Sequence, residues 1–561
     1  MKIKSTILLS SLLASTICAN PIPPKIGDVL KEVTPPKIER EQKQIPKIKQ
    51  EQISTPKEFE DGKKVRVERF LISGATHMSN EELKQIVAPY EGEDLSFNQI
   101  QEITTLITKA YRSKGYFVAR AYIPEQNIMT QDNRLKINII EGNYGEFKLE
   151  NKSLVKDSIL QSNLDDIKDK DIISTNTLER AMLIINDTPG AVVTKADVRP
   201  GKEVGTSDFL IGTEATNRVN GYLIGDNYGS QYTGKHRIMA GVDINSPFNI
   251  GDKISAFGFT SEKEGLLSGK LAYDFPIHAN GTRGEISYSK TTYELGSLSK
   301  ELDAVGQSDS LTGRVTYPIL KTRVENLDSY VEVSYNKMKD EIQLVDLVDS
   351  KVKKDSYTAT TGLDYTKDSL VFNKNSQTRA GVSITFGRLS FNDKDDKESD
   401  KKGANTQGQF SKINIELGKD IDIFDSLKWS NTLQMQYALG NKNLDGSQDL
   451  SVGGINGVKF YQDGEESAEN GYIYNTEFIY TLPIIAGIDN KISLFYDIGR
   501  VYMSRNFTQE KSRTLQDIGL GYKVSYKNFF ANSYLAYNIG NEVTSQDNYN
   551  SRAMLQVGYI F

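Results

Sequence analysis

Residues 429–439 read WSNTLQMQYAL, and the apolar and polar side chains of this stretch alternate. The apolar positions are Trp429, Leu433, Met435, Tyr437 and Leu439, and the polar positions are Ser430, Thr432, Gln434 and Gln436. Successive side chains of a β-strand point to opposite faces of the sheet. The alternation therefore predicts a strand of about ten residues with one apolar and one polar face.

The same alternation recurs from about Thr216 to the end of the chain, where 24 of the 29 tyrosines are found. Turn residues divide this region into about sixteen strands, which begin near positions 216, 235, 251, 267, 280, 309, 327, 355, 377, 410, 427, 470, 490, 514, 529 and 551. An even number of antiparallel strands can close into a barrel with an apolar wall around a polar lumen. We therefore predict a membrane all-β fold over residues 215–561, a 16-stranded antiparallel transmembrane β-barrel.

A soluble β-sandwich or propeller would alternate in a similar way, so the pattern leaves that alternative open. The N-terminus favours the barrel. Lys2 and Lys4 precede an apolar run from Ile7 to Ile17, which is typical of a secretory signal peptide over residues 1–19. A buried N-terminal helix is the alternative, but the prolines from Pro21 onward would stop it. No later apolar run reaches the 18 or so residues of a membrane-spanning helix, so we expect a membrane form of this chain to cross with strands.

Composition excludes several classes of protein. The chain has 561 residues, 38% hydrophobic and 25% charged, with a net charge of −6. These values exclude general disorder, and they give no basic surface for nucleic acid. Three histidines and one cysteine make a zinc or Cys/His catalytic centre improbable, and no phosphate-binding loop, nucleophile elbow or His-Glu-x-x-His motif occurs. We expect no metal, no cofactor and no enzymatic activity.

Residues 20–62 differ from the rest of the chain, because proline, lysine and glutamine dominate them. This composition predicts an extended linker over residues 34–62 rather than a packed core. One amphipathic stretch, Ile26 to Val33, is compatible with a short helix within residues 20–33.

Residues 63–144 predict a compact α+β unit in the order strand, helix, helix, strand, strand. Capping boxes at Ser79–Glu82 and Ser96–Gln99 mark two helix starts, and Gly115 follows the second helix. Residues 145–214 repeat the pattern, with the turn at Pro189 and Gly190 before the next strand. Two tandem copies of one unit suggest a binding arm.

Several motifs resemble those of the two-partner secretion transporters, the outer-membrane branch of the Omp85 superfamily that exports haemolysins and filamentous adhesins. The segments YRSKGY at 111–116, AYIPEQ at 121–126 and IEG at 140–142 resemble the first POTRA domain of that family. The segment NDTPG at 186–190 resembles the second, with Thr188 where a leucine is usual. The resemblance implies structural or partner-binding roles in these domains for Tyr111, Gly115, Tyr116, Pro124, Gln126, Glu141, Gly142, Pro189 and Gly190.

Two further motifs lie in the barrel. GGINGVKFY at 453–461 resembles the tip of the family's inserted loop, here about residues 441–470, and FYDIG at 495–499 resembles the wall motif that the tip meets. Strand alternation turns Phe495, Asp497 and Gly499 toward the lumen. The resemblance implies a contact between this wall and Val458, Lys459, Phe460 and Tyr461. Asp497 could equally line a solvated pore.

The loop tip departs from the family pattern, in which an arginine and a glycine follow the valine. Lys459 carries a point charge rather than a planar fork, and Phe460 adds bulk where glycine is usual. A Lys459–Asp497 ion pair would nevertheless fix the loop in the lumen.

The resemblance implies a translocator that binds one unfolded exoprotein in the periplasm through its POTRA domains and secretes it through the barrel without nucleotide hydrolysis. Residues 26–33 would plug the pore. The expected partners are the exoprotein, outer-membrane lipid and lipopolysaccharide, and the barrel assembly machinery, which would read Tyr559 and Phe561 as a terminal signal. An aromatic girdle would place the same two residues there. An assembly factor of the same superfamily is the main alternative, and a passive porin would leave residues 65–214 without a role.

Overall fold

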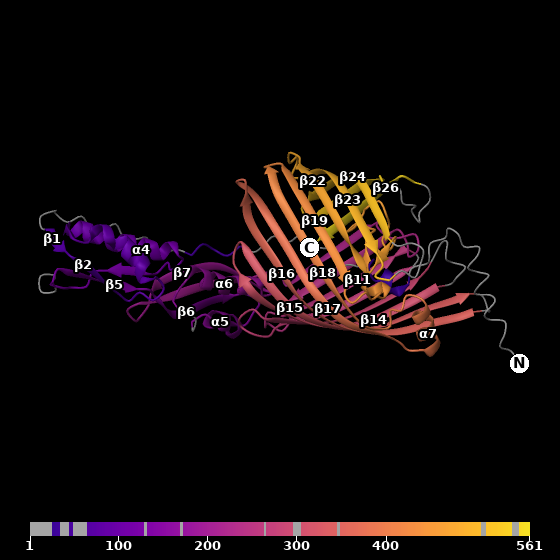
Figure 1. Cartoon of the computed structure of the whole chain (residues 1–561), viewed down its shortest axis with the longest axis horizontal. Helices are drawn as coiled ribbons and strands as arrows, with labels where there is room; N and C mark the ends of the chain where they lie inside the picture. The colour runs from indigo at the N-terminus through magenta and orange to yellow at the C-terminus, as the bar shows by residue number, and fades with distance from the viewer. Residues whose placement is uncertain are drawn as a thin grey trace.

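The computed structural model describes residues 25–33, 44–48, 64–127, 132–168, 172–262, 265–295, 304–344, 348–505, 512–540 and 549–561. The predicted signal peptide and most of the predicted linker lie outside these ranges. Figure 1 shows two small α+β units extending in line from one end of a large barrel. No helix among the described residues is both long and apolar enough to cross a bilayer.

The barrel is closed and has sixteen antiparallel strands in the described chain, as predicted, because β26 pairs with β9. The strands are β9 (Val219–Asp226), β10 (Arg237–Asn245), β11 (Lys253–Ser261), β12 (Leu266–Pro276), β13 (Arg283–Glu294), β14 (Ala304–Lys321), β15 (Glu325–Leu344), β16 (Val348–Val371), β17 (Lys374–Phe391), β18 (Gly408–Phe424), β19 (Leu427–Ala438), β22 (Asn470–Thr481), β23 (Asp489–Tyr502), β24 (Ser512–Tyr526), β25 (Phe529–Asn538) and β26 (Ser551–Ile560). Helix α7 (Lys394–Lys402) lies at the barrel end remote from the α+β units.

Side chains alternate across the barrel wall. Met435 and Tyr437 of β19 are 42% and 55% exposed, whereas Gln436 between them is buried. On β23, Ile492 and Leu494 face outward, and Phe495 and Asp497 are buried on the inner side. An apolar outer face and a polar inner face are what a strand in contact with lipid requires.

The first α+β unit contains β1 (Lys64–Val67), β2 (Arg69–Ser73), α3 (Asn80–Val87), the short η2 (Ala88–Tyr90), β3 (Glu93–Ser96), α4 (Phe97–Ser113), β4 (Arg120–Tyr122) and β5 (Arg134–Ile140). Both predicted capping boxes form, at Ser79 and Ser96. The single opening strand expected from the sequence is instead two strands. β1 pairs with β3 and β2 pairs with β5, so the chain changes sheets at Glu68, whose N–H donates to the Asn133 carbonyl (2.9 Å).

The second unit contains β6 (Asn143–Lys152), α5 (Asp157–Asp165), α6 (Thr175–Asp187), β7 (Ala191–Pro200) and β8 (Thr206–Ala215), with the sheet order β6-β8-β7. Its core lies between the sheet and the two helices, around Leu160, Leu178, Ile185 and Phe209. β8 is followed almost at once by β9, so this unit is joined closely to the barrel wall.

Two pieces of the N-terminal region are packed against the rest of the molecule. Helix α2 (Ile26–Val29) lies against the inner barrel wall, where Ile26 and Val29 are fully buried. Ile45 lies within the predicted linker, yet it is buried in the core of the second α+β unit. The composition of residues 34–62 did not predict this burial, because one isoleucine between prolines and lysines gives no periodicity.

Candidate functional site

The inserted loop lies between β19 and β22 and folds back into the barrel. Its two arms are joined by the short strands β20 (Leu450–Ser451) and β21 (Ser467–Ala468), with η6 (Gly446–Gln448) before them. The tip is folded tightly on itself: the Val458 N–H donates to the Val452 carbonyl (2.8 Å), and the Gly454 N–H donates to the Tyr461 carbonyl (3.0 Å). Such a tip presents its side chains in a fixed arrangement.

Lys459 at the tip forms an ion pair with Asp497 on the barrel wall. Its Nζ lies 2.8 Å from Asp497 Oδ2, and it lies 4.4 Å from the ring centroid of Phe495. Asn475 donates to the second carboxylate oxygen of Asp497 (2.7 Å) and to the Gly457 carbonyl (2.8 Å). Asp497 is fully buried, so both of its oxygens are satisfied by polar partners from the loop and the wall.

Asp517 on β24 is a residue of this site that sequence reasoning missed. It lies directly opposite Asp497 in the β23–β24 register, and its carboxylate accepts the backbone N–H of Phe460. The two adjacent carboxylates therefore receive a lysine side chain and a backbone amide from consecutive residues of the tip. The inward-facing position of Asp517 on its strand was the available signal, but a register between strands is not readable from one sequence.

Gly499 provides the space that the tip occupies. A Cβ at this position would lie 2.9 Å from Cβ of Val452 and 3.2 Å from a methyl carbon of Val458. Val452 and Val458 are themselves fully buried, in one apolar cluster with Phe495. The wall motif therefore combines a carboxylate that binds the tip with a glycine that lets it approach.

Tyr461 and Arg552 fix the other side of the tip. Tyr461 is fully buried, and its hydroxyl donates to Asn538 (3.1 Å). The Arg552 guanidinium donates to the carbonyls of Tyr461 (2.6 Å) and Tyr228 (3.1 Å), which joins the tip to β26 and to the segment after β9.

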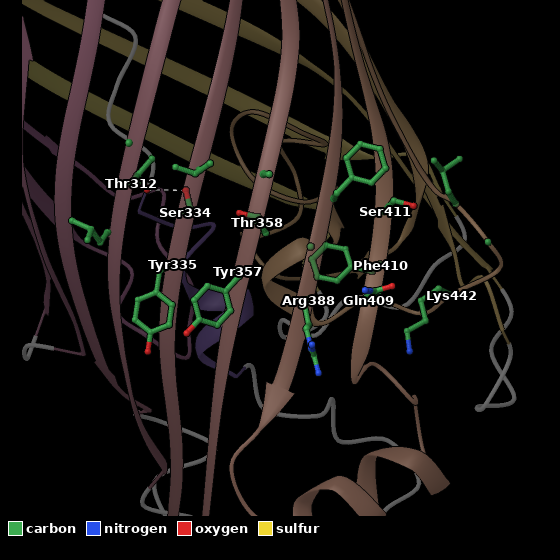
Figure 2. Close-up of a pocket in the computed structure, with 18 of the residues that line it drawn as sticks. Thr312, Ser334, Tyr335, Tyr357, Thr358, Arg388, Gln409, Phe410, Ser411 and Lys442 are labelled. Carbon is green, nitrogen blue, oxygen red and sulfur yellow. Dashed lines mark hydrogen bonds between the residues drawn. The ribbon is translucent and has the colours of Figure 1, made fainter.

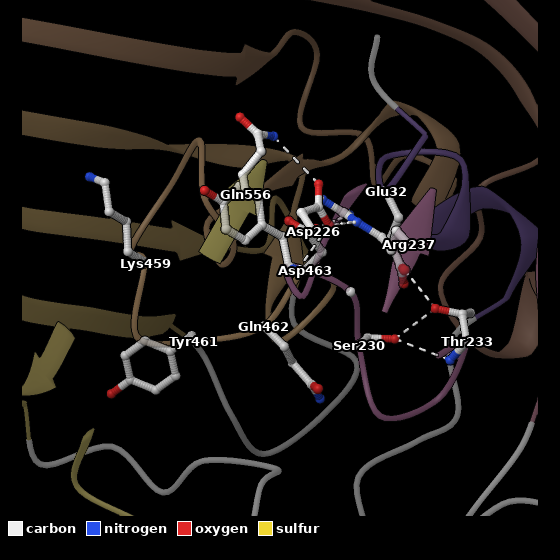
Figure 3. A network of polar contacts seen from close by, with 12 residues as sticks. Glu32, Asp226, Ser230, Thr233, Arg237, Lys459, Tyr461, Gln462, Asp463 and Gln556 are labelled. Atoms are coloured by element: carbon white, nitrogen blue, oxygen red, sulfur yellow. Dashed lines mark hydrogen bonds and ion pairs between the residues drawn. The ribbon is translucent and has the colours of Figure 1, made fainter. Parts of the chain in front are cut away.

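A second polar network holds the descending arm of the loop, as Figure 3 shows. Arg237 on β10 pairs with Asp226 on β9 (2.7 Å) and with Asp463 of the loop (3.1 Å). Gln462 accepts the N–H of Gln231 (2.9 Å). Together with Arg552 on β26, this network binds the loop on both sides of the seam between β9 and β26.

The N-terminal segment contacts the loop directly. The Ile26 N–H donates to Asp340 of the barrel wall (2.8 Å), and Glu32 accepts from Thr233 (2.6 Å). Gly27 lies against the loop, since a Cβ there would lie 2.5 Å from the Ser447 backbone nitrogen. The inserted loop and the N-terminal segment thus lie inside the barrel and contact each other.

The POTRA motif residues of the first unit build a buried acidic centre. Glu141 accepts the Tyr111 hydroxyl (2.8 Å), the backbone N–H groups of Thr76 (2.7 Å) and His77 (2.9 Å), and the His77 ring (2.8 Å). Burial raises the pKa of this carboxyl group, but the hydrogen bonds from Thr76 and His77 outweigh it and lower the pKa to about 2. Burial, together with Glu141, raises the pKa of Tyr111. Tyr116 packs against the rings of His77 and Tyr111.

The glycines of this motif join the two α+β units. Gly115 and Gly142 adopt positive φ angles of 93° and 91°. The Gly115 carbonyl accepts the Thr175 N–H (2.9 Å), and the Gly142 carbonyl accepts the Ile173 N–H (3.0 Å). Both glycines therefore act structurally at the joint.

The remaining motif residues also have structural contacts. The Gln126 amide donates to the Lys136 carbonyl and accepts its N–H, each at 2.8 Å, and also donates to the Pro124 carbonyl (3.3 Å). Pro189 precedes Gly190, whose φ is 95° and where a Cβ would lie 2.9 Å from Ser246 of the barrel. The Pro189–Gly190 turn thus lies at the junction with the barrel.

Tyr559 and Phe561 lie on the outer wall next to the barrel seam. Phe561 exchanges two backbone hydrogen bonds with Gly221 (2.8 and 2.9 Å), and its ring stacks on Tyr559. Both side chains are partly exposed, at 37% and 48%.

Several separable polar contacts hold the inserted loop in the lumen. Within the described residues, no group of three or more His, Cys, Asp or Glu side chains could hold a metal ion. The ion pairs at Asp497 and Arg237 link the loop to the wall at several points. A buried ion pair contributes little net stability, and its geometry favours one position of the loop against the wall.

Comparison with known proteins is consistent with this arrangement. A family model described as "Haemolysin secretion/activation protein ShlB/FhaC/HecB" matches residues 205–524, and a model described as "POTRA domain, ShlB-type" matches residues 65–142. The heme/hemopexin transporter protein HuxB of Haemophilus influenzae is 29% identical over 475 residues, which cover 83% of this chain and 82% of the relative. The outer membrane transporter CdiB of Escherichia coli is 22% identical over 444 residues, covering 75% of this chain and 70% of the relative.

A solved structure of CdiB from Escherichia coli has the same fold. It superposes with a TM-score of 0.71 at 18% identity and covers 91% of this chain and 92% of that chain.

Proposed function

This chain belongs to the haemolysin secretion/activation family of ShlB, FhaC and HecB, and from that premise we propose how it moves its cargo. It is a two-partner secretion transporter of the outer membrane, a member of the Omp85 superfamily, with its POTRA domains in the periplasm. Transporters of this kind each pair with a secreted exoprotein. The family is one of protein transporters rather than enzymes.

Capture of the unfolded exoprotein would occur on the POTRA domains. In the described sheets, β2 and β4 of the first domain and β6 and β7 of the second each pair with one neighbour only. An extended peptide can add to such an outer strand through main-chain hydrogen bonds, which give affinity without demanding one sequence. Leu71 on β2 is 43% exposed and offers an apolar contact beside that edge.

Passage would require the two lumenal segments to move. The observation that carries this proposal is that the inserted loop and the N-terminal helix lie inside the barrel and contact each other at Gly27 and Ser447. Polar contacts with the wall, rather than the strand ladder, hold the loop tip and the helix there. An entering segment would displace residues 26–33, which act as a plug, and would shift the inserted loop. Folding of the exoprotein outside the cell would supply the driving force, because no nucleotide is hydrolysed.

Two further partners belong to this proposal. The exposed aromatic residues Tyr559 and Phe561, at the seam of the barrel, would be recognised by the barrel assembly machinery during insertion. The outer wall would contact outer-membrane lipid and lipopolysaccharide.

Comparison of cells with and without this gene tests the export function. Proteins of the medium and of the outer membrane are both measured. Loss of one large secreted protein with other barrels unchanged is expected, and it would identify the cargo. A broad fall in many barrel proteins would instead indicate an assembly factor.

Photo-crosslinking tests the capture step. A photoreactive residue at Leu71 should trap the exoprotein in the periplasm. The matched control is Val204, which is 95% exposed in the turn between β7 and β8 of the second domain and belongs to no strand. Equal trapping at both positions would contradict capture on the β2 edge.

A further inference from the structure

The outer wall carries a groove of about 1110 Å³ that crosses strands β13 to β19 (Figure 2). Exposed apolar side chains line it, among them Leu311 (52%), Val333 (54%), Tyr357 (57%) and Phe386 (56%). A barrel wall is expected to be convex, so a hollow of this size requires an explanation in the sequence.

The groove results from alternating side-chain size across neighbouring strands. One row of directly paired residues reads Ile286, Gly313, Val333, Ala359, Phe386 and Ser411. Every second member is small, so hollows lie between the larger side chains. The branched and aromatic side chains around these hollows can make dispersion contacts with lipid acyl chains.

The next row toward the extracellular end ends in a cation. Its paired residues are Leu311, Tyr335, Tyr357 and Arg388. The Tyr335 and Tyr357 rings lie 4.8 Å apart, and Figure 2 shows them pointing with Arg388 toward the side of α7. Within the described ranges, no carboxylate or carbonyl pairs with the exposed Arg388 guanidinium.

Lysines continue this cationic rim above the tyrosines. Lys339 on β15 forms an ion pair with Glu341 and lies directly opposite Lys353 on β16, and like charges in that relation repel each other. Lys337 lies between Asp309 on β14 and Asp355 on β16, whose carboxylates also accept the hydroxyls of Tyr288 (2.6 Å) and Tyr335 (2.9 Å). A bound anion would reduce the repulsion between Lys339 and Lys353.

We propose that the groove and its rim bind a phosphorylated acyl glycolipid of the outer leaflet. Acyl chains fill the hollows beside Gly313 and Ala359, and phosphate groups contact Arg388, Lys337 and Lys353. Because neighbouring strands lie about 4.8 Å apart, cations on three successive strands can reach one head group that carries more than one phosphate. The inference rests on the contact with outer-membrane lipid and lipopolysaccharide that the proposed function includes, and it locates that contact at this groove.

Native mass spectrometry of the full-length protein with added diphosphorylated lipid A tests the proposal. The variant R388Q/K337Q/K353Q should retain lipid A at least fivefold less well than the wild type. The control is Arg500→Gln. Arg500 is an exposed, outward-facing arginine near the extracellular end of β23, and it does not line this groove. Equal retention by the wild type and the triple variant, or an equal loss in Arg500→Gln, would overturn the proposal.

A second measurement fixes the identity of the ligand. Dephosphorylated lipid A and inorganic phosphate should each fail to compete with lipid A, whereas effective competition by inorganic phosphate would overturn assignment to a lipid. Equal competition by phosphatidylglycerol would overturn assignment to a glycolipid. Folding of each variant is checked by its thermal unfolding midpoint. Lipid retention is measured on purified protein, and export is measured in cells. A failure of the lipid-binding proposal can therefore be distinguished from a failure of the proposed export function.

Discussion

At the residue scale, the inserted loop places one lysine against a doubly acidic wall. Asp497 and Asp517 are adjacent and buried, and the loop tip brings them Lys459 and the Phe460 amide. Removing one member of a buried pair leaves an uncompensated charge, which costs about 3–5 kcal/mol. The cost falls on the inserted position of the loop, because the wall strands keep their ladder of hydrogen bonds in either case.

Lys459→Met is therefore expected to release the tip and raise the single-channel conductance of the purified protein in a planar bilayer. The control is Lys523→Met, since Lys523 is also a partly buried lysine on the inner face of β24 but pairs with Glu477 (3.1 Å) instead of the loop. Unchanged conductance in Lys459→Met, or an equal rise in both variants, would count against the ion pair as the closure.

Glu141 makes the first POTRA domain sensitive to acid. Its pKa is lowered from 4.5 to about 2. Ionised Glu141 therefore stabilises the folded domain fully when the pH is above 4.5, and this stabilisation is lost as the pH falls toward 2. The protection factors of the amides in residues 64–142, calculated relative to the intrinsic exchange rate at each pH, should fall between pH 5 and pH 2 by the equivalent of up to about 3 kcal/mol. Glu141→Gln should accelerate exchange already at pH 7, and a variant that exchanges like the wild type at every pH would refute this role.

At the element scale, features that depend on a local sequence pattern could be predicted, whereas features that depend on contacts between distant segments could not. The strands, the two POTRA units and the inward face of β23 follow from local alternation, which one sequence displays. The pairing of Asp517 with the tip, the Arg237 network and the burial of Ile45 depend on which distant segments meet. Helix α2 is an intermediate case: its amphipathic pattern predicts a helix, whereas its position against the loop depends on a glycine at one contact.

Gly27→Val should unseat the N-terminal helix without deleting it, because a Cβ would lie 2.5 Å from the Ser447 backbone nitrogen. We expect a larger fraction of open time in bilayer recordings, comparable with that of a deletion of residues 25–33. Lys25→Val is the control, since Lys25 is the exposed residue before the helix. Equal open fractions in the wild type, Gly27→Val and the deletion would remove the helix from the closure.

At the scale of the whole molecule, the second POTRA domain is bound to the barrel through charged and backbone contacts at the turn between β14 and β15. Arg323 pairs with Glu179 of α6 (2.6 Å) and donates to the carbonyls of Ile45 (2.8 Å) and Pro46 (2.9 Å). Lys321 pairs with Asp187 (2.5 Å). One arginine therefore connects three parts of the chain, namely the barrel, the second POTRA domain and the N-terminal segment.

Arg323→Ala should loosen the N-terminal segment from this joint. Hydrogen exchange of the peptide that contains Ile45 is expected to increase at least tenfold, with little change in the barrel strands. Lys374→Ala is the control, because Lys374 begins β17, directly after the turn that follows β16, and pairs only distantly with Asp425 (3.9 Å) in the described structure. Unchanged exchange at Ile45 would show that apolar packing alone holds this segment.

The attachment of Ile45 sets a limit on how far the N-terminal helix can travel. Ten residues, positions 34–43, separate Val33 from the attached segment, and a fully extended chain of that length spans at most about 36 Å. A helix expelled from the lumen stays within that radius of the periplasmic mouth, at an effective concentration on the order of millimolar. Reclosure after each export event is then a first-order process, whose rate does not depend on how many copies of the transporter the membrane holds.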